Sequence, residues 1–286
     1  MKGSDSELPV YHIRSESRWR LLDFAELWQH RELLFFLSWR DLKVRYKQTL
    51  LGFAWAIITP LVLTVVFTLF FGRLGKLPTD GLPKPVFYMA GLVIWRYFAT
   101  ALQSIANSLV GNAHLLTKVY FPRLLIPLSL AMTALVELGI AFGMLLILML
   151  YFNTTPALTS LLLPLLVVAT MLTALGVGLF FAALNVRFRD VGSVLPLMVQ
   201  MWMYVTVIIP FSRIPQSLGD WRYLYGLNPV AGVVEGWRWC LMHNVEGGAI
   251  PSPWPLLAVG APVTIVLLLV GLLYFHRVER QFADIV

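Results

Sequence analysis

Six long apolar runs constrain the fold of this chain more than any other feature of its sequence. The clearest extends from Leu124 to Phe152 and contains one charged residue, Glu137. Because an α-helix rises about 1.5 Å per residue, about 20 apolar residues suffice to cross a hydrocarbon core of about 30 Å. The sequence therefore predicts an all-α membrane protein with six transmembrane helices, at about residues 50–71, 86–110, 124–152, 156–184, 194–210 and 254–275.

The composition agrees and excludes several other classes of protein. Only 13% of the 286 residues are charged and 58% are hydrophobic, whereas soluble domains carry about 25% charged residues. The single cysteine and five scattered histidines exclude an internal disulfide and predict no metal site. No paired catalytic carboxylates and no GxxxxGK[ST] phosphate loop are found, so we expect a non-enzymatic chain without cofactors of its own.

The first fifty residues are more polar. Residues 1–20 form a polar stem to which we assign no role, and basic residues break up any signal-peptide core. Residues 21–49 predict an amphipathic helix, in which Asp41 and Arg45 can pair four residues apart. Its aromatic residues, with Arg40, Lys43 and Lys47, favour a helix in the membrane interface, although a solvated helix remains an alternative.

The basic residues also predict the orientation. Fifteen Lys and Arg lie in residues 1–49, 111–123, 185–193 and 276–286, against six in residues 72–85, 153–155 and 211–254. Since cytoplasmic loops carry the excess of positive charge, both termini should be cytoplasmic. This is consistent with six spans, because an even number returns the chain to the side on which it starts. The net charge of +7 is then explained without a nucleic-acid partner.

A short segment between the second and third spans predicts a two-turn helix at residues 112–121. Asn112 can cap its start, and Pro122 forces Phe121 out of helical geometry. A helix of two turns has little apolar surface to bury alone. It should either lie on the lipid surface or dock into a partner.

Glu137 is the one acidic side chain deep within a span. A charge at the bilayer centre costs about 2–3 kcal/mol on insertion scales, so Glu137 should face protein or water. Two interpretations remain open: it lines a pathway, or it is a protonated or hydrogen-bonded group that packs helices.

Aromatic residues are frequent toward the side expected to be outside. They are either an interfacial belt or a surface along which sugar rings slide on aromatic faces. The candidates for such a channel are Phe87, Tyr88, Trp95, Tyr97, Phe98, Trp202 and Tyr204.

The segment 211–253 is too polar to cross the membrane and too rich in Trp, Leu and Val for a solvated loop. It predicts short helices at 212–225 and 230–242, separated by the Gly226–Pro229 break. These helices either re-enter the membrane within a protein or water environment, forming an outer gate, or rest on the surface.

Four segments in register resemble a known family. They are RDLKVRYKQTLLGFAWAIITP at 40–60, LLTKVYFPRLLIP at 115–127, NVRFRDV at 185–191 and LNPVAGVVEGWRW at 227–239. Over about residues 20–280 the chain resembles the membrane subunit of type-2 ABC exporters for cell-surface polysaccharides, the O-antigen and capsule permeases.

This resemblance implies a homodimer in the bacterial inner membrane, bound to two copies of a cytoplasmic ATPase that holds ATP and Mg²⁺. The substrate would be a lipid-linked polysaccharide on an undecaprenyl pyrophosphate. Residues 21–47 would be an interface helix that also touches the ATPase, and 211–253 the periplasmic gate. The coupling helix would present Asn112, His114, Leu115, Leu116, Lys118, Tyr120 and Phe121 to the ATPase. The gate residues would be Trp221, Tyr225, Asn228, Glu235, Trp237 and Arg238.

The basic residues Arg40, Lys43, Arg45 and Lys47 would attract a pyrophosphate head group or anionic phospholipid, and the two are not exclusive. Other cargoes remain open, namely capsule polymer, teichoic acid or a small hydrophobic compound. A membrane transferase acting on lipid-linked sugars would need carboxylates, for which Asp80, Asp220, Glu235 and Glu246 are the outer candidates. A non-transporting scaffold is a further alternative.

Overall fold

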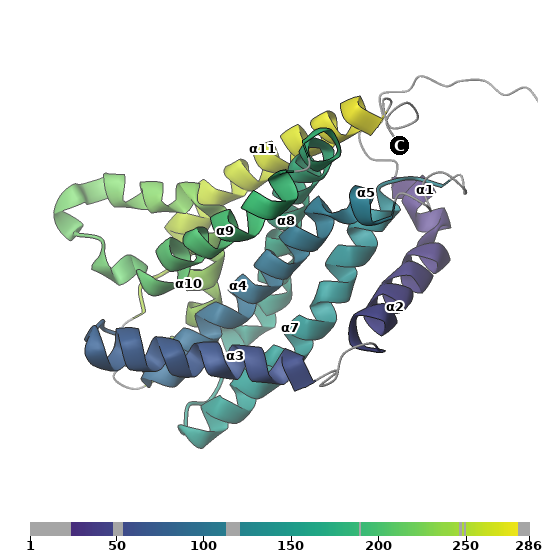
Figure 1. Cartoon of the computed structure of the whole chain (residues 1–286). Coiled ribbons are helices and arrows are strands. Elements are labelled where there is room, and N and C mark those ends of the chain that lie inside the picture. The colour runs from purple at the N-terminus through teal and green to yellow at the C-terminus, as the bar shows by residue number, and fades with distance from the viewer. Residues whose placement is uncertain are drawn as a thin grey trace, which may run out of the picture.

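The computed structural model describes residues 24–47, 54–112, 121–188, 190–245, 248 and 250–279, and these ranges contain helices and loops but no strand (Figure 1). Among these described residues, six helical stretches are long and apolar enough to cross a membrane. They span Ala54–Leu74, Lys84–Ala106, Leu125–Tyr151, Leu158–Arg187, Val191–Ile208 and Trp254–Val278. The prediction of an all-α chain with six spans is confirmed, and the largest boundary differences are about four residues.

The six spans correspond to the following elements. They are α3 (Ala54–Phe67) with η1 (Thr68–Leu74), α4 (Lys84–Ala106), α7 (Leu125–Tyr151), η2 (Leu158–Leu162) with α8 (Leu163–Arg187), α9 (Val191–Met203) with η3 (Tyr204–Ile208), and α11 (Trp254–Glu279). The other helices within the described ranges are α1 (Phe24–Gln29), α2 (Arg31–Lys47), α5 (Ser108–Gly111), η4 (Phe211–Arg213), η5 (Gln216–Leu227) and α10 (Pro229–Met242). The polar stem, residues 1–20, lies outside the described residues.

Two of the spans change geometry before they end. The first and fifth spans finish in the π-helical stretches η1 and η3. A π-helix shifts the backbone hydrogen bonds by one residue, and such stretches are frequent at functional sites. In the fifth span, Pro210 follows closely and cannot donate a backbone hydrogen bond, so the helix stops there.

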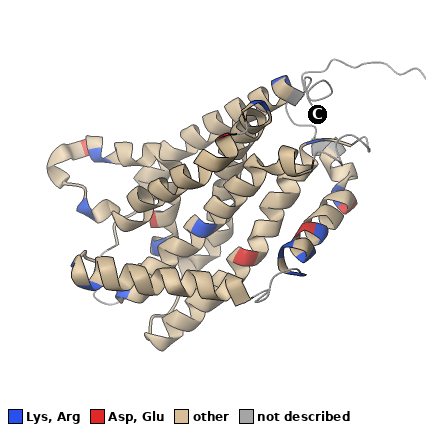
Figure 2. Cartoon of the chain, viewed as in Figure 1, with Lys and Arg blue, Asp and Glu red and all other residues tan. Residues whose placement is uncertain are grey.

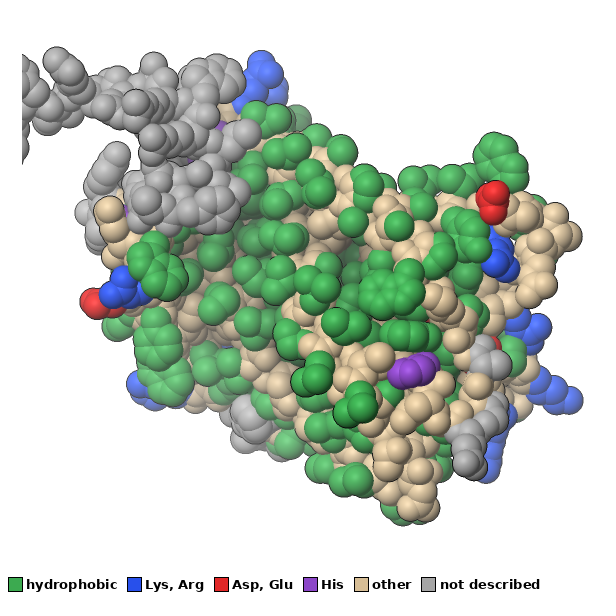
Figure 3. Space-filling model, turned by 180° about the vertical axis from the view of Figure 1, so that it is seen from behind, with side chains coloured by type: hydrophobic (Ala, Val, Ile, Leu, Met, Phe, Trp, Pro, Cys, Tyr) green, Lys and Arg blue, Asp and Glu red, His purple; other side chains and the backbone are tan. Residues whose placement is uncertain are grey.

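Helix α4 is at the centre of the bundle and packs against α3, α7, α8, α9 and α10 (Figure 1). Every residue from Val86 to Trp95 is buried. Charged residues are sparse along the spans (Figure 2), and hydrophobic side chains cover much of the face seen in Figure 3. An apolar outer surface around a packed centre is what a lipid environment requires.

Hydrogen bonds bring the expected cytoplasmic segments to one end of the bundle, which we call the inner end. Asn185, at the end of α8, donates to the Asn107 Oδ1 atom at 2.9 Å and accepts from the Gly192 amide at 3.2 Å. Arg40 Nη2 donates to Asn112 Oδ1 at 3.0 Å. At the opposite, outer end, the Ala157 amide donates to the Leu241 carbonyl at 3.0 Å.

The N-terminal helix departs from its expected form. It is broken at His30 into α1 and α2, and α2 lies alongside α7 (Figure 1). Ser38 of α2 faces α7, since its Oγ donates to the Ser129 carbonyl at 3.3 Å and Thr133 Oγ1 donates to the Ser38 carbonyl at 3.2 Å. Leu37 is buried at 4% exposure, whereas Phe35, 72% exposed, points outward together with the charged Lys43 and Lys47. The side of α2 that faces α7 therefore carries both an apolar and a polar residue, and α7 satisfies the polar groups of Ser38 that lipid could not.

The segment between the fifth and sixth spans forms two short helices, as the Gly226–Pro229 break predicts. Only α10 is enclosed, and nearly all of its residues are buried. By contrast, η5 is largely exposed and projects from the outer end (Figure 1). Burial within the subunit separates the two helices, because α10 is enclosed by protein whereas η5 leaves Leu218, Trp221, Leu224 and Leu227 exposed.

Candidate functional site

A buried ion pair lies where α10 meets the end of the fifth span. Arg238 Nη1 lies 3.1 Å from Glu235 Oε1, and the two side chains are 0% and 3% exposed. The other arginine nitrogen, Nη2, donates to the Val207 carbonyl at 2.8 Å, and Glu235 Oε1 accepts from the Phe211 amide at 3.3 Å. In a continuous α-helix the Phe211 amide would bond to the Val207 carbonyl, four residues back. The ion pair therefore takes both partners of the missing helical bond.

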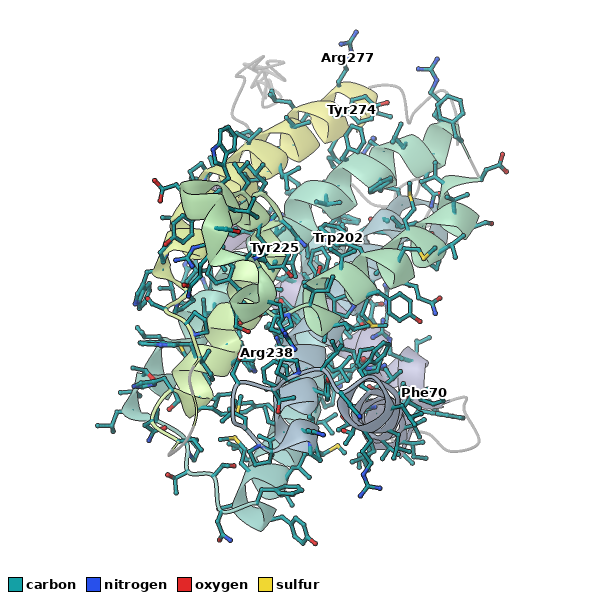
Figure 4. The ribbon with its side chains drawn as sticks, turned by 90° about the vertical axis from the view of Figure 1, so that its left-hand side faces the viewer. Phe70, Trp202, Tyr225, Arg238, Tyr274 and Arg277 are labelled. Atoms are coloured by element: carbon teal, nitrogen blue, oxygen red, sulfur yellow. The ribbon has the colours of Figure 1, made fainter. Side chains whose placement is uncertain are left out.

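Two further side chains hold the same turn of backbone. The Tyr225 hydroxyl lies 3.0 Å from the carbonyls of both Val205 and Ile209. Asn228 Nδ2 donates to Thr206 Oγ1 at 2.9 Å. Four of the residues expected in the outer gate, Tyr225, Asn228, Glu235 and Arg238, thus converge on the outer end of the fifth span. Figure 4 shows Tyr225 and Arg238 between the helices, whereas Phe70 and Arg277 point outward.

Phe87 and Gly91 of the second span complete the surroundings of Arg238, which we call its cradle. The guanidinium carbon lies 3.9 Å from the centre of the Phe87 ring, which is the contact of a cation with an aromatic face. A Cβ atom at Gly91 would lie 2.5 Å from Arg238 Nη2, so only glycine leaves room for the guanidinium. Burial raises the pKa of Glu235, while Arg238 and the Phe211 amide act in the opposite direction.

The two remaining gate candidates have different positions. Trp221 is 74% exposed on η5. Trp237 is 2% exposed and packs edge-to-face on Phe142 of α7, with ring centres 5.6 Å apart. Trp221 is thus free to meet a molecule outside the bundle, whereas Trp237 attaches α10 to the third span.

The expected channel aromatics need correction. Five of them are at most 3% exposed within the subunit and belong to its core, namely Phe87, Tyr88, Trp95, Tyr97 and Phe98. Trp202 packs edge-to-face on Trp95 and Phe98, with centres 5.9 and 5.1 Å away. Of the seven, Tyr204 is the most exposed, at 39%. The aromatic residues near one side of the membrane indicate the depth at which they lie, but not which way each ring faces. Most of these rings belong to α4 and pack against the neighbouring helices.

A second ion pair lies nearer the inner end. Arg45 Nη1 on α2 lies 2.6 Å from Glu137 Oε1 on α7, and the side chains are 31% and 13% exposed. Arg45 Nη2 donates to Ser104 of α4 at 3.1 Å, and the Tyr46 hydroxyl donates to Glu137 at 3.3 Å. Glu137 therefore joins helices through a charge-assisted bond. Burial and the neighbouring Glu137 raise the pKa of Tyr46 to about 12, against the opposing charges of Arg45 and Arg96.

The four basic residues expected to contact a lipid head group divide into two pairs. Arg40 bonds to Asp41 Oδ1 at 2.6 Å and to Asn112, and Arg45 bonds to Glu137. The expected Asp41–Arg45 pairing is therefore replaced by two others, one between the adjacent residues Arg40 and Asp41 and one between Arg45 and the distant Glu137. Lys43 and Lys47 are exposed, and Lys43 Nζ lies over the Trp39 ring at 5.4 Å. These two lysines are the better placed for an anionic lipid.

The coupling helix lies mostly outside the described residues, which include only Asn112 and Phe121 of its expected set. His114, Leu115, Leu116, Lys118 and Tyr120 fall in the range 113–120 that is not described. Among the carboxylates considered for a transferase, Glu235 is occupied by Arg238, Asp220 is exposed, and Glu246 is outside the described part. The described residues contain no group of His, Cys, Asp or Glu that could hold a metal ion.

Sequence reasoning missed several contacts. The Asn107–Asn185 bond joins segments 78 residues apart, and the Ser38–Thr133 bond joins segments 95 apart. Arg96 lies inside the second span, and the sequence pattern assigned it no role. A signal was present, since an arginine at the middle of a span is as costly as Glu137.

Comparisons with known proteins agree with this architecture. Residues 32–242 match the family model for the ABC-2 type transporter. The O-antigen export system permease protein RfbA of Myxococcus xanthus is 29% identical over 261 residues, covering 91% of this chain and 97% of the relative. RfbA of Klebsiella pneumoniae is 27% identical, with coverage of 89% and 95%. The polysialic acid transport protein KpsM of Escherichia coli is 27% identical, with coverage of 86% and 93%. Since the family model matches well over half of its length, the chain belongs to the ABC-2 type transporter family.

Proposed function

We propose that this chain is the membrane-spanning subunit of an ATP-driven exporter that moves a lipid-linked polysaccharide of the O-antigen type out of the cytoplasm. The observation that carries this proposal is the alignment of 91% of the chain with an O-antigen export permease. The six candidate spans support it. Both termini lie on the cytoplasmic side of the bacterial inner membrane, which the excess of Lys and Arg at the inner end supports.

The energy comes from a partner. Two copies of a cytoplasmic ATPase bind ATP and Mg²⁺ and act on a homodimer of this chain through residues 112–121. Segments that adjoin this helix support transmission to the spans, because Asn112 bonds to Arg40 of α2 at 3.0 Å. Movement of the coupling helix thus reaches both the third span and α2.

The head group of the carrier lipid, an undecaprenyl pyrophosphate, meets the exposed Lys43 and Lys47 first. Anionic lipid gains about 1 kcal/mol per basic residue near the surface, so two exposed lysines recruit it without a closed pocket. The polymer leaves past η5, where Trp221 offers an exposed ring.

Replacing Tyr120 and Phe121 with Asp tests the docking role. We expect export of polymer in cells to be abolished, because two charges cannot be buried in a protein cleft, while membrane insertion stays normal. Leu158→Asp is the control, since Leu158 is 90% exposed at the outer end. Normal export by the double variant would contradict coupling at this site.

The purified chain alone should hydrolyse no ATP, and ATP hydrolysis should appear when the ATPase partner is added. Rapid hydrolysis by the isolated chain would refute the proposal of a separate motor.

Capsule polymer is a second candidate cargo, favoured by the similarity to KpsM, a polysialic acid transport protein. Expression of the chain in strains lacking either the O-antigen or the capsule permease separates the two by which surface polymer returns.

A further inference from the structure

The inner half of α4 carries a polar face that the function described so far does not use. After ten residues buried on all sides, from Val86 to Trp95, partial exposure begins at Arg96. The partly exposed positions that follow in α4 are Ala99, Thr100, Gln103 and Ser104. Residues three, four and seven apart share one face of a helix, so these positions form a single stripe. Four of its five members, including Arg96, are polar.

This stripe begins in the middle of the membrane. Arg96 lies twelve residues after Lys84 and ten before Ala106 in α4, which places it about 18 Å and about 15 Å from the two ends of the helix. An arginine at that depth costs about 2.5–3.5 kcal/mol on insertion scales when it faces lipid. Four polar side chains along one face require water or protein beside them.

Glu137, the one acidic residue deep within a span, is already engaged in an ion pair. Glu137 is paired with Arg45 at 2.6 Å, and that pair is neutral as a unit. Within the part of the chain that the structure describes, Arg96 has no carboxylate within ion-pair distance. Its positive charge lowers the pKa of Tyr46, against the larger raising effects of burial and Glu137. The region therefore keeps one uncompensated positive charge at mid-membrane.

The stripe is continuous with the inner cluster. Ser104, its last member in α4, accepts a hydrogen bond from Arg45 Nη2 at 3.1 Å. Asn107, one turn further on, is exposed and bonds to Asn185. Polar groups thus run from the inner end of the bundle to Arg96 without an apolar interruption longer than Ala99.

We propose that this face of α4 lines a water-filled vestibule open to the cytoplasm, and that Arg96 receives the phosphate-bearing head of the anionic lipid-linked substrate at mid-membrane. The proposal rests on the proposed function for its ligand class. A phosphate is complementary to Arg96, which presents several N–H donors to oxygen anions. Above Arg96 the buried half of α4 closes the route, so the head group stops there until the outer end rearranges.

Cysteine labelling tests the vestibule independently of export. Cys240, which is the only cysteine and is buried, is first replaced by Ala. Thr100→Cys in inside-out vesicles should then react with membrane-impermeant methanethiosulfonates, and react faster with the anionic than with the cationic reagent. Adding Arg96→Gln should lower the ratio of the anionic to the cationic reaction rate by on the order of tenfold, because one unit charge is removed near the thiol. Ile265→Cys, 58% exposed at mid-α11, is the control and should not react.

An unreactive Thr100→Cys, or a ratio unchanged by Arg96→Gln, would overturn the proposal even if export is normal. Labelling as expected in a chain that exports no polymer would instead refute the proposed function and leave the anion site standing.

A reconstituted complex with the ATPase gives the second readout. Arg96→Gln should raise, by on the order of tenfold, the concentration of lipid-linked substrate that half-maximally stimulates ATP hydrolysis, and Arg96→Lys should restore most of it. Arg277→Gln, exposed at the inner end of α11, should behave as wild type. Equal stimulation of Arg96→Gln and wild type would contradict a role for Arg96 in holding the head group.

Discussion

The two halves of α4 differ in what surrounds them. From Val86 to Trp95 the helix is enclosed by apolar neighbours and by the dry Glu235–Arg238 pair, whose side chains are 3% and 0% exposed. From Arg96 onward one face is polar and partly exposed. It lies beside the Arg45–Glu137 pair, whose side chains are 31% and 13% exposed. The same helix thus belongs to a closed outer half and an open inner half. The difference suggests a rigid outer closure below which an anionic substrate can collect.

The strongest test of the outer half is Arg238→Met. This change leaves Glu235 buried without its cation and the Val207 carbonyl without a donor, so we expect a loss of about 3–5 kcal/mol of stability. Thermal unfolding in detergent measures it, with the exposed Arg213→Met as control. Adding Glu235→Gln to Arg238→Met should recover part of the loss. An unfolding midpoint equal to that of wild type would show that the pair is not what holds this end together.

Gly91→Ala tests the cradle without removing a charge. The new Cβ would lie 2.5 Å from Arg238 Nη2 and force the guanidinium away from Phe87, for an expected loss of about 1–3 kcal/mol. Gly139→Ala is the matched control, because no atom lies within 4 Å of its Cβ position. Similar unfolding midpoints for the two variants would argue against tight packing at Arg238.

The inner pair should be weaker. A double-mutant cycle with Arg45→Gln and Glu137→Gln isolates its coupling, which we expect at about 1 kcal/mol, because partly exposed pairs are screened by water. Chemical unfolding of the four proteins measures the coupling. A value as large as the loss in Arg238→Met would remove the contrast between the two halves.

The smallest effect concerns Tyr46. Its pKa is raised to about 12, whereas an unfolded tyrosine ionises near pH 10. The folded state therefore resists ionisation, and this contribution to stability is complete below about pH 10 and is lost as the pH rises toward about 12. Unfolding midpoints of wild type and Tyr46→Phe should converge over that range. A constant difference between them across this range would contradict the placement of Tyr46 beside Glu137.

Much of the fold was predictable because membrane insertion depends on sums over adjacent residues. The run Leu124–Phe152 became a helix from Leu125 to Tyr151, and Pro229 began α10 where the break was expected. The candidate site was less predictable. Tyr225, Asn228, Glu235 and Arg238 were identified as a group, yet their common target, the backbone around Val207, was not.

The aromatic residues show the limit most clearly. Trp95 and Phe98 were expected on a channel surface and are in the core, because composition along a span says nothing about its rotation. Likewise, Asp41 and Arg45 satisfy a local spacing rule, yet Arg45 pairs with Glu137, 92 residues away.

The sequence alone determined the six candidate spans, their positions to within about four residues, and which group of loops carries the excess of positive charge. Each of these follows from apolar length and charge in consecutive residues. Only the tertiary structure decided which way each helix turns about its axis, and so which charges meet, which rings are buried and which face of α4 is open. Those choices depend on contacts between residues far apart in the chain, and their free energies are not local sums.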